Sequence, residues 1–183
     1  HDMNNHNLVM WKLAEKGEYE RLHKYIGKLR PLEKDRHRQW TQNLILDMIL
    51  EYKLLAMEKK KILYEIKTDM IGEIALADKE LCILLGNLLD NAIEACEKLE
   101  EEKRMVKIEV RKHHSMFMLI VENSCEAHAQ VRKGIFRTTK KDDRMHGYGI
   151  HNVRKTVKNH GGQFQYGSRG ENFYVKILIP LVI

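Results

Sequence analysis

Apolar residues recur at helical spacing in two N-terminal segments of the chain. Through residues 1–29 they stand three and four positions apart, and Gly17 interrupts this period, which predicts that a helix bends or ends there. Pro31 excludes a continuous helix through the polar connector 30–35. The helical period returns in residues 40–57. The apolar stripe of this second helix consists of Leu44, Ile45, Met48, Ile49, Tyr52, Leu55 and Ala56.

Two helices joined by a short connector predict an antiparallel hairpin. A single hairpin cannot bury the apolar stripes of both helices, so it requires a partner. We therefore predict that residues 1–57 form a helical hairpin that pairs with a second copy in a dimeric four-helix bundle. The alternative is that the stripe packs against the chain's own second half.

Short apolar runs and longer helical segments alternate after Lys61. The expected strands are residues 62–66, 105–110, 116–121, 163–166 and 172–180. The expected helices are residues 79–99, with Asp78 as N-cap, and residues 149–160, ended by Gly161 and Gly162. This order predicts a two-layer α/β sandwich with its helices on one face of the sheet, so the fold class is α+β. The two expected domains are residues 1–57 and 58–183.

Composition narrows the class of protein. The chain has 183 residues, 43% of them apolar, which suits a folded domain with a substantial core plus a helical element. Its 32 basic and 26 acidic residues are interspersed, which favours a mixed surface over direct binding of nucleic acid. The three cysteines have no C-x-x-C spacing, so a reducing cytosol is favoured over disulfides or a zinc site.

The apolar runs and the first residue of the chain indicate whether a membrane span is to be expected in it. No run approaches the roughly 18 residues of a membrane span. The chain begins at His1 with no initiator methionine. We therefore expect a fragment of a longer protein, in which a membrane anchor could precede His1.

The helical segment LLGNLLDNAIEA, residues 84–95, separates its polar side chains from its apolar ones. Asn87, Asn91 and Glu94 share one helical face, at positions i, i+4 and i+7. Two amides one turn apart can offer carbonyl oxygens to a hard cation and NH2 groups to phosphate oxygens. The alternative is an ordinary polar helix face.

A second candidate site is HGYGI, residues 146–150, at the start of a helix. Gly147 and Gly149 allow close backbone approach, and the helix start directs free N–H groups at an anion. The preceding FRTTK, residues 136–140, is basic and hydroxylated, so a loop there could close over phosphates. The alternative is a simple turn between loop and helix.

Together these motifs resemble a known family. NLLDNAIEA on a helix, then two strands, a loop with TTK, and HGYGIHNV entering a helix that ends at GG resemble the ATP-binding domain shared by gyrase, Hsp90, histidine kinases and MutL. With the opening HDMNN, the chain resembles sensor histidine kinases of the Agr and VirS type, which respond to peptides in Gram-positive bacteria.

The resemblance implies an activity and partners. It implies that the chain binds ATP and Mg²⁺, autophosphorylates a histidine and transfers the phosphoryl group to an aspartate of a response regulator. It also implies a homodimer and a cytoplasmic location in a bacterial quorum-sensing protein. The membrane would be reached only through an N-terminal sensor region that this chain lacks.

The resemblance also assigns a nucleotide site by position. Asn91 falls at the Mg²⁺ ligand, and Asn87 at an amide that contacts phosphate or water. Asn123 stands where most relatives have the adenine-recognising Asp of a D-x-G-x-G box, although residues 121–125 here contain no glycine. The full assigned set is Asn87, Asp90, Asn91, Asn123, Thr139, Lys140, Gly147 and Gly149.

One charge usual in the family is absent. Glu94 and Ala95 replace the common Lys-Tyr pair, which leaves Lys140 or Arg137 to neutralise phosphate charge.

The opening HDMNNH matches the family's phosphorylation motif. The resemblance makes His1 the phosphorylated residue, Asp2 the acid that orients the ring and accepts its proton, and Asn5 the amide that positions a water. His6 is the rival acceptor, but Asn7 after it offers no base. A zinc site is disfavoured because a five-residue separation rotates His1 and His6 about 140° apart on a helix.

Two other functions remain open. One is a nucleotide-sensing scaffold, without competent chemistry, that binds a partner through the hairpin. The other is a serine kinase of the anti-sigma type on the same fold, which is disfavoured because such kinases lack a His-bearing hairpin.

Overall fold

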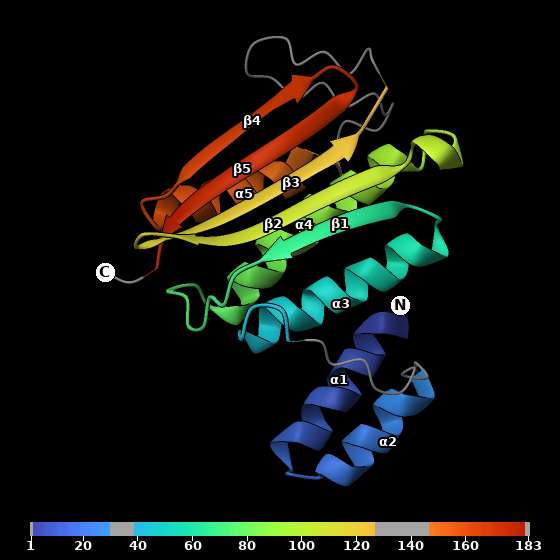
Figure 1. Cartoon of the computed structure of the whole chain (residues 1–183). Helices are drawn as coiled ribbons and strands as arrows, with labels where there is room; N and C mark the ends of the chain where they lie inside the picture. Colours follow the sequence, from blue (N-terminus) through green and yellow to red (C-terminus); the bar gives the residue numbers. More distant parts are fainter. Residues whose placement is uncertain (1, 30–38, 127–146, 182–183) are drawn as a thin grey trace. The chain divides into compact units, whose positions relative to one another are not determined.

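The computed structural model describes residues 2–29, 39–126 and 147–181, and the chain divides into two compact units, residues 1–36 and 37–183 (Figure 1). This division differs from the boundary expected at residues 57 and 58. No helix among the described residues has the length and apolar character needed to cross a bilayer.

The first unit contains a hairpin of two helices, α1 (Asp2–Glu15) and α2 (Tyr19–Leu29). Gly17 lies between them at φ +68°, a left-handed conformation that favours glycine, so the predicted interruption there is confirmed. His6 Nδ1 lies 2.8 Å from the Tyr25 hydroxyl oxygen and joins the two helices. No described side chain of α2 is fully buried, and Trp11 of α1 is exposed.

The second unit is built on a five-stranded sheet with strand order β1-β2-β3-β5-β4. β1 pairs with β2 in parallel, and the other neighbours are antiparallel. The strands are β1 (Leu63–Thr68), β2 (Met105–His113), β3 (Met116–Ser124), β4 (Gln163–Arg169) and β5 (Asn172–Pro180).

The helices of this unit form a second layer on one face of the sheet (Figure 1). They are α3 (Leu44–Lys59), α4 (Asp78–Cys96) and α5 (Gly147–Asn159), with a short 3₁₀ turn at Glu101–Lys103. α4 packs on β2 and β3, while α5 packs on β4 and β5. The predicted α+β class and two-layer sandwich are therefore confirmed for this part of the chain.

The core lies between these two layers. Alternate residues of β3 are buried, as expected for a strand with one face against helices. The buried positions of β3 are Phe117, Leu119, Val121 and Asn123. They meet the apolar face of α4, which consists of Leu81, Leu84, Leu85, Leu88, Leu89, Ala92 and Ile93.

α3 packs against α4 inside the second unit, whereas the sequence placed residues 40–57 in an N-terminal hairpin. In the single chain, two residues of the expected stripe lie outside the core, because Leu44 and Met48 keep 71% and 53% of their surface exposed. The side chains that pack into the core are Leu46, Leu50, Leu54 and Met57. α3 carries apolar residues on two sides, so its period alone does not select the buried one.

Side chains fix the N-terminal end of α3. Asn43 is the N-cap, and its side chain accepts the Leu46 N–H at 3.1 Å. Buried Asp47 accepts hydrogen bonds from the Thr41 N–H at 2.9 Å and the Thr41 hydroxyl at 2.7 Å. Gln42, between these groups, has φ 59°. The start of α3 is thus a compact, hydrogen-bonded turn.

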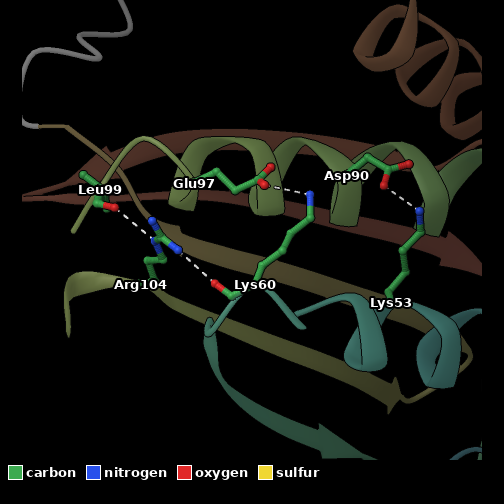
Figure 2. Close-up of polar contacts among 6 residues, drawn as sticks. All are labelled: Lys53, Lys60, Asp90, Glu97, Leu99 and Arg104. Carbon is green, nitrogen blue, oxygen red and sulfur yellow. Dashed lines mark hydrogen bonds and ion pairs between the residues drawn. The ribbon is translucent and has the colours of Figure 1, made fainter. Parts of the chain in front are cut away.

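Arg104 fixes the opposite end of α3 (Figure 2). Its guanidinium donates to the Lys60 carbonyl oxygen at 2.9 Å and to the Leu99 carbonyl oxygen at 3.0 Å. Lys60 is the C-cap of α3, and Leu99 follows the end of α4. One side chain therefore joins the C-terminal ends of both helices.

The start of α4 differs slightly from the prediction. Its N-cap is Ala77 rather than Asp78, which is the first helical residue. The Glu80 carboxylate accepts the Ala77 N–H at 3.0 Å, so the third helical residue supplies the cap that the alanine side chain cannot.

Candidate functional site

The amide face of α4, which we define as Asn87 and Asn91, is partly exposed while the opposite face of the helix is buried. The segregation predicted from the sequence is therefore confirmed. The Asn87 amide nitrogen donates to the Ile83 carbonyl oxygen at 2.7 Å. This bond turns the amide oxygen of Asn87 away from its own helix.

Gly149 of α5 packs directly on Asn87. A Cβ atom added at Gly149 would lie 2.9 Å from the Asn87 amide oxygen, closer than van der Waals contact allows. At the other end of the same helix pair, His160 Nε2 lies 2.9 Å from a Glu80 carboxylate oxygen. α5 therefore runs antiparallel to α4, and its N-terminal end lies beside the amide face.

The start of α5 carries the groups that a helix needs to bind an anion. The helix begins at Gly147, so the backbone N–H groups of its first turn have no partner within the helix. The positive end of the helix dipole points the same way. At Gly149 the absence of a side chain leaves room for the Asn87 amide, while the predicted approach of an anion to this backbone stays a prediction.

Asn123 contributes a polar group from the sheet. It is 5% exposed, and its amide nitrogen donates to the Ser124 carbonyl oxygen at 2.9 Å. Its amide nitrogen is thus occupied, which leaves its amide oxygen as the group that could accept a hydrogen bond from a ligand.

The end of β3 lies beside the C-terminal end of α4. Cys96 Sγ lies 3.7 Å from the Ser124 carbonyl oxygen and 3.5 Å from the Met105 carbonyl oxygen. Burial raises the pKa of the Cys96 thiol, so it stays protonated at neutral pH. Cys96 is therefore a packing residue at the base of the site.

The Asp90 side chain points toward α3 and not to the side of α4 that carries Asn87 and Asn91. Its carboxylate lies 2.5 Å from Lys53 Nζ of α3 (Figure 2). The sequence assigned Asp90 to the nucleotide, and Lys53 was missed. No local signal in the sequence pointed to Lys53, because the two residues lie 37 positions apart.

The remaining predicted residues divide into two groups. Asp2 and Asn5 lie in α1, in the first compact unit, and Asn5 is exposed. His1, Thr139 and Lys140 lie outside the described residues.

Comparison with known proteins identifies the second unit. A family model described as "GHKL domain" matches residues 76–180, which is more than half of the chain. None of the curated proteins compared with the chain matches it.

Solved structures of histidine kinases share the fold. The nucleotide-free catalytic domain of histidine kinase ThkA aligns with a TM-score of 0.61 at 21% identity, covering 80% of this chain and 98% of that one. The histidine kinase AdeS of Acinetobacter baumannii aligns at 0.56 and 14% identity, covering 100% and 98%. The blue-light activated histidine kinase of Erythrobacter litoralis aligns at 0.54 and 14%, covering 79% and 65%.

The matched residues 76–180 include α4, β3 and α5, which carry the amide face, Asn123 and the glycines. The chain therefore belongs to the GHKL domain family, and its fold is that of histidine kinase catalytic domains.

Proposed function

We propose that the second unit binds Mg-ATP between α4 and the start of α5. GHKL domains bind ATP, generally with Mg²⁺. The observation that carries the proposal is the contact between Gly149 and Asn87, which puts two amides beside a helix N-terminus. Amide oxygens suit a hard cation, and amide and backbone N–H groups suit phosphate oxygens, so the residues fit this ligand.

Each described polar group has a role in this proposal. Asn91 supplies an oxygen ligand to Mg²⁺, and Asn87 contacts phosphate or a bound water. Asn123 accepts a hydrogen bond from the adenine amino group, because its own amide nitrogen is already bonded to Ser124. Mg²⁺ supplies charge neutralisation at the phosphates. Thr139 and Lys140 add hydroxyl donors and a positive charge from the connecting segment.

The proposed reaction is phosphorylation of His1. A neutral imidazole nitrogen of His1 attacks the γ-phosphorus, the bond from that phosphorus to the β,γ-bridging oxygen breaks, and ADP leaves. Asp2 orients the ring and accepts the proton from its other nitrogen. The phosphoryl group then passes to an aspartate of a response regulator, and Asn5 positions a water for dephosphorylation. We further propose a homodimer formed through the N-terminal helices, in a membrane-anchored bacterial sensor of the Agr and VirS type whose catalytic part is cytoplasmic.

Nucleotide binding is tested by isothermal titration of the chain with Mg-ATP. Asn91→Ala should weaken binding at least tenfold, because it removes the Mg²⁺ ligand. Asn159→Ala is the matched control, since Asn159 is exposed at the far end of α5. Equal affinities in the Asn91 and Asn159 variants would place the nucleotide elsewhere.

Phosphorylation is tested separately with labelled ATP. We expect an acid-labile, base-stable adduct that is lost in His1→Gln and kept in His6→Gln. Equal labelling of the His1 variant would exclude His1 as the acceptor.

A second candidate function is a nucleotide-sensing scaffold. It is favoured by the neutral Asn123 in place of an acid and by the lack of glycine in residues 121–125. Tight ATP binding by a chain that never becomes labelled would support it.

A further inference from the structure

Lys53 and Asp90 join α3 to α4 at the edge of the proposed nucleotide site (Figure 2). Their charged atoms lie 2.5 Å apart. The Lys53 side chain is only 12% exposed, while that of Asp90 is 56% exposed. A lysine this covered has little freedom, so the ammonium group is held against Asp90 rather than sampling solvent.

The helix that carries Lys53 is fixed at both ends. Asn43 and Asp47 hold its start, and Arg104 holds its end. Lys53 lies about midway between these attachments, next to the buried Leu54. The Lys53 ammonium group therefore projects from a helix that is fixed at both ends, which distinguishes this pair from an ion pair between mobile surface side chains.

The amide face lies in a run of acidic charge. After Glu80 in its first turn, the charged residues of α4 and its C-cap are Asp90, Glu94 and Glu97, all acidic. Lys60 of α3 pairs with Glu97 at 2.8 Å, as Lys53 pairs with Asp90. α3 thus places two lysines along α4, and the one nearer to the amide face is Lys53.

The Asp90 carboxylate lies close enough to the proposed site to repel a bound triphosphate electrostatically. Asp90 directly precedes Asn91, and helical geometry puts its carboxylate within about 10 Å of a ligand bound to that amide. An uncompensated carboxylate at this distance repels a polyanion, and the repulsion is moderate because about 10 Å is close to the Debye length in physiological salt. A neutral ligand at the same place is unaffected.

We propose that Lys53 is a positioning residue for nucleotide binding that acts through Asp90. It neutralises and holds the Asp90 carboxylate, so that the amide face accepts the triphosphate. This inference rests on the proposed function and names a residue of α3, outside the residues 76–180 matched by the family model.

The test compares charged and neutral ligands. Lys53→Met should weaken Mg-ATP binding about three- to tenfold, by the electrostatic argument above, and leave adenosine binding unchanged. Asp90→Asn introduced into the Lys53→Met chain should restore most of the Mg-ATP affinity, because it removes the uncompensated charge. Lys53→Arg should keep the wild-type affinity. Lys60→Met is the matched control, since it breaks a similar pair farther from Asn91, and should change Mg-ATP affinity less than twofold.

The outcomes separate this inference from the proposed function. Equal loss of Mg-ATP and adenosine binding in Lys53→Met would reveal a purely structural role and overturn the inference. Unchanged Mg-ATP binding in that variant would overturn it too, while leaving the proposed function intact. Failure of the unsubstituted chain to bind Mg-ATP would reject both.

Discussion

Replacing Gly149 by alanine should abolish tight nucleotide binding without unfolding the protein. The new Cβ would lie 2.9 Å from the Asn87 amide oxygen, 3.4 Å from its Cγ and 3.6 Å from its Cβ. The backbone of Gly149 is helical and has no positive φ, so the alanine itself fits. The Asn87 side chain must therefore move, and its bond to the Ile83 carbonyl oxygen is the one at risk.

The two effects on stability nearly cancel. Alanine in a helix is favoured over glycine by about 1 kcal/mol. Loss of the Asn87–Ile83 hydrogen bond costs about 1 kcal/mol. Displacing Asn87 also removes the hydrogen bond that we propose it makes to a charged phosphate. Such a bond is worth about 1.5–3 kcal/mol, which corresponds to roughly a 10- to 150-fold weaker ATP affinity.

The assay pairs urea unfolding with isothermal titration of Mg-ATP. Gly86→Ala is the matched control, because Gly86 lies in α4 next to Asn87 and an added Cβ there meets nothing within 4 Å. We expect the Gly86 variant to be about 0.5–1 kcal/mol more stable and to bind ATP normally. A Gly149→Ala chain that is stable and binds ATP as tightly as wild type would refute the reasoning.

Three further substitutions test the attachments around the core. Gln42→Gly should raise the free energy of unfolding by about 0.5–1 kcal/mol, because φ 59° is strained for glutamine, and a lower value in urea unfolding would contradict this. Asp47→Ala should lower the free energy of unfolding by about 2–3 kcal/mol in the same assay, because it leaves two buried donors of Thr41 without an acceptor. A decrease of less than about 0.5 kcal/mol would show that water replaces the lost carboxylate. The hydrogen bond from His160 and, to a lesser extent, that from the Ala77 N–H lower the pKa of Glu80 in the folded protein. The contribution of Glu80 to folding stability is therefore present above its unfolded-state pKa and is lost as the pH falls through its lower folded-state pKa. Glu80→Gln should therefore reduce the loss of thermal stability below about pH 4.5, and an unchanged acid profile would exclude this role.

Much of the second unit follows from local sequence signals. Strand alternation placed β3 and β5 within a few residues, and the 3.6-residue period placed α4 with its amides on one face. Each of these elements has a single apolar face, so the pattern along the chain also specifies which face is buried in the core. The amide face and the helix start at Gly147 were predictable for this reason.

The features that the sequence did not specify involve elements whose apolar pattern allows more than one buried face. α3 has apolar residues on two sides, and only the position of α4 selects Leu50 and Leu54 rather than Met48 for the core. The division of the chain at residues 36 and 37 follows from the same packing. Lys53 was missed because its partner Asp90 is 37 residues away, and no local period connects them.

The sequence by itself determined the class of fold and which polar residues share one face of α4, because alternation, helical period and motif spacing are properties of neighbouring residues. Only the tertiary structure decided which face of α3 is buried, that Gly149 touches Asn87, and that Lys53 neutralises Asp90. These depend on contacts between segments far apart in the chain, where the free energy of burial and of charge pairing is set by which surfaces meet.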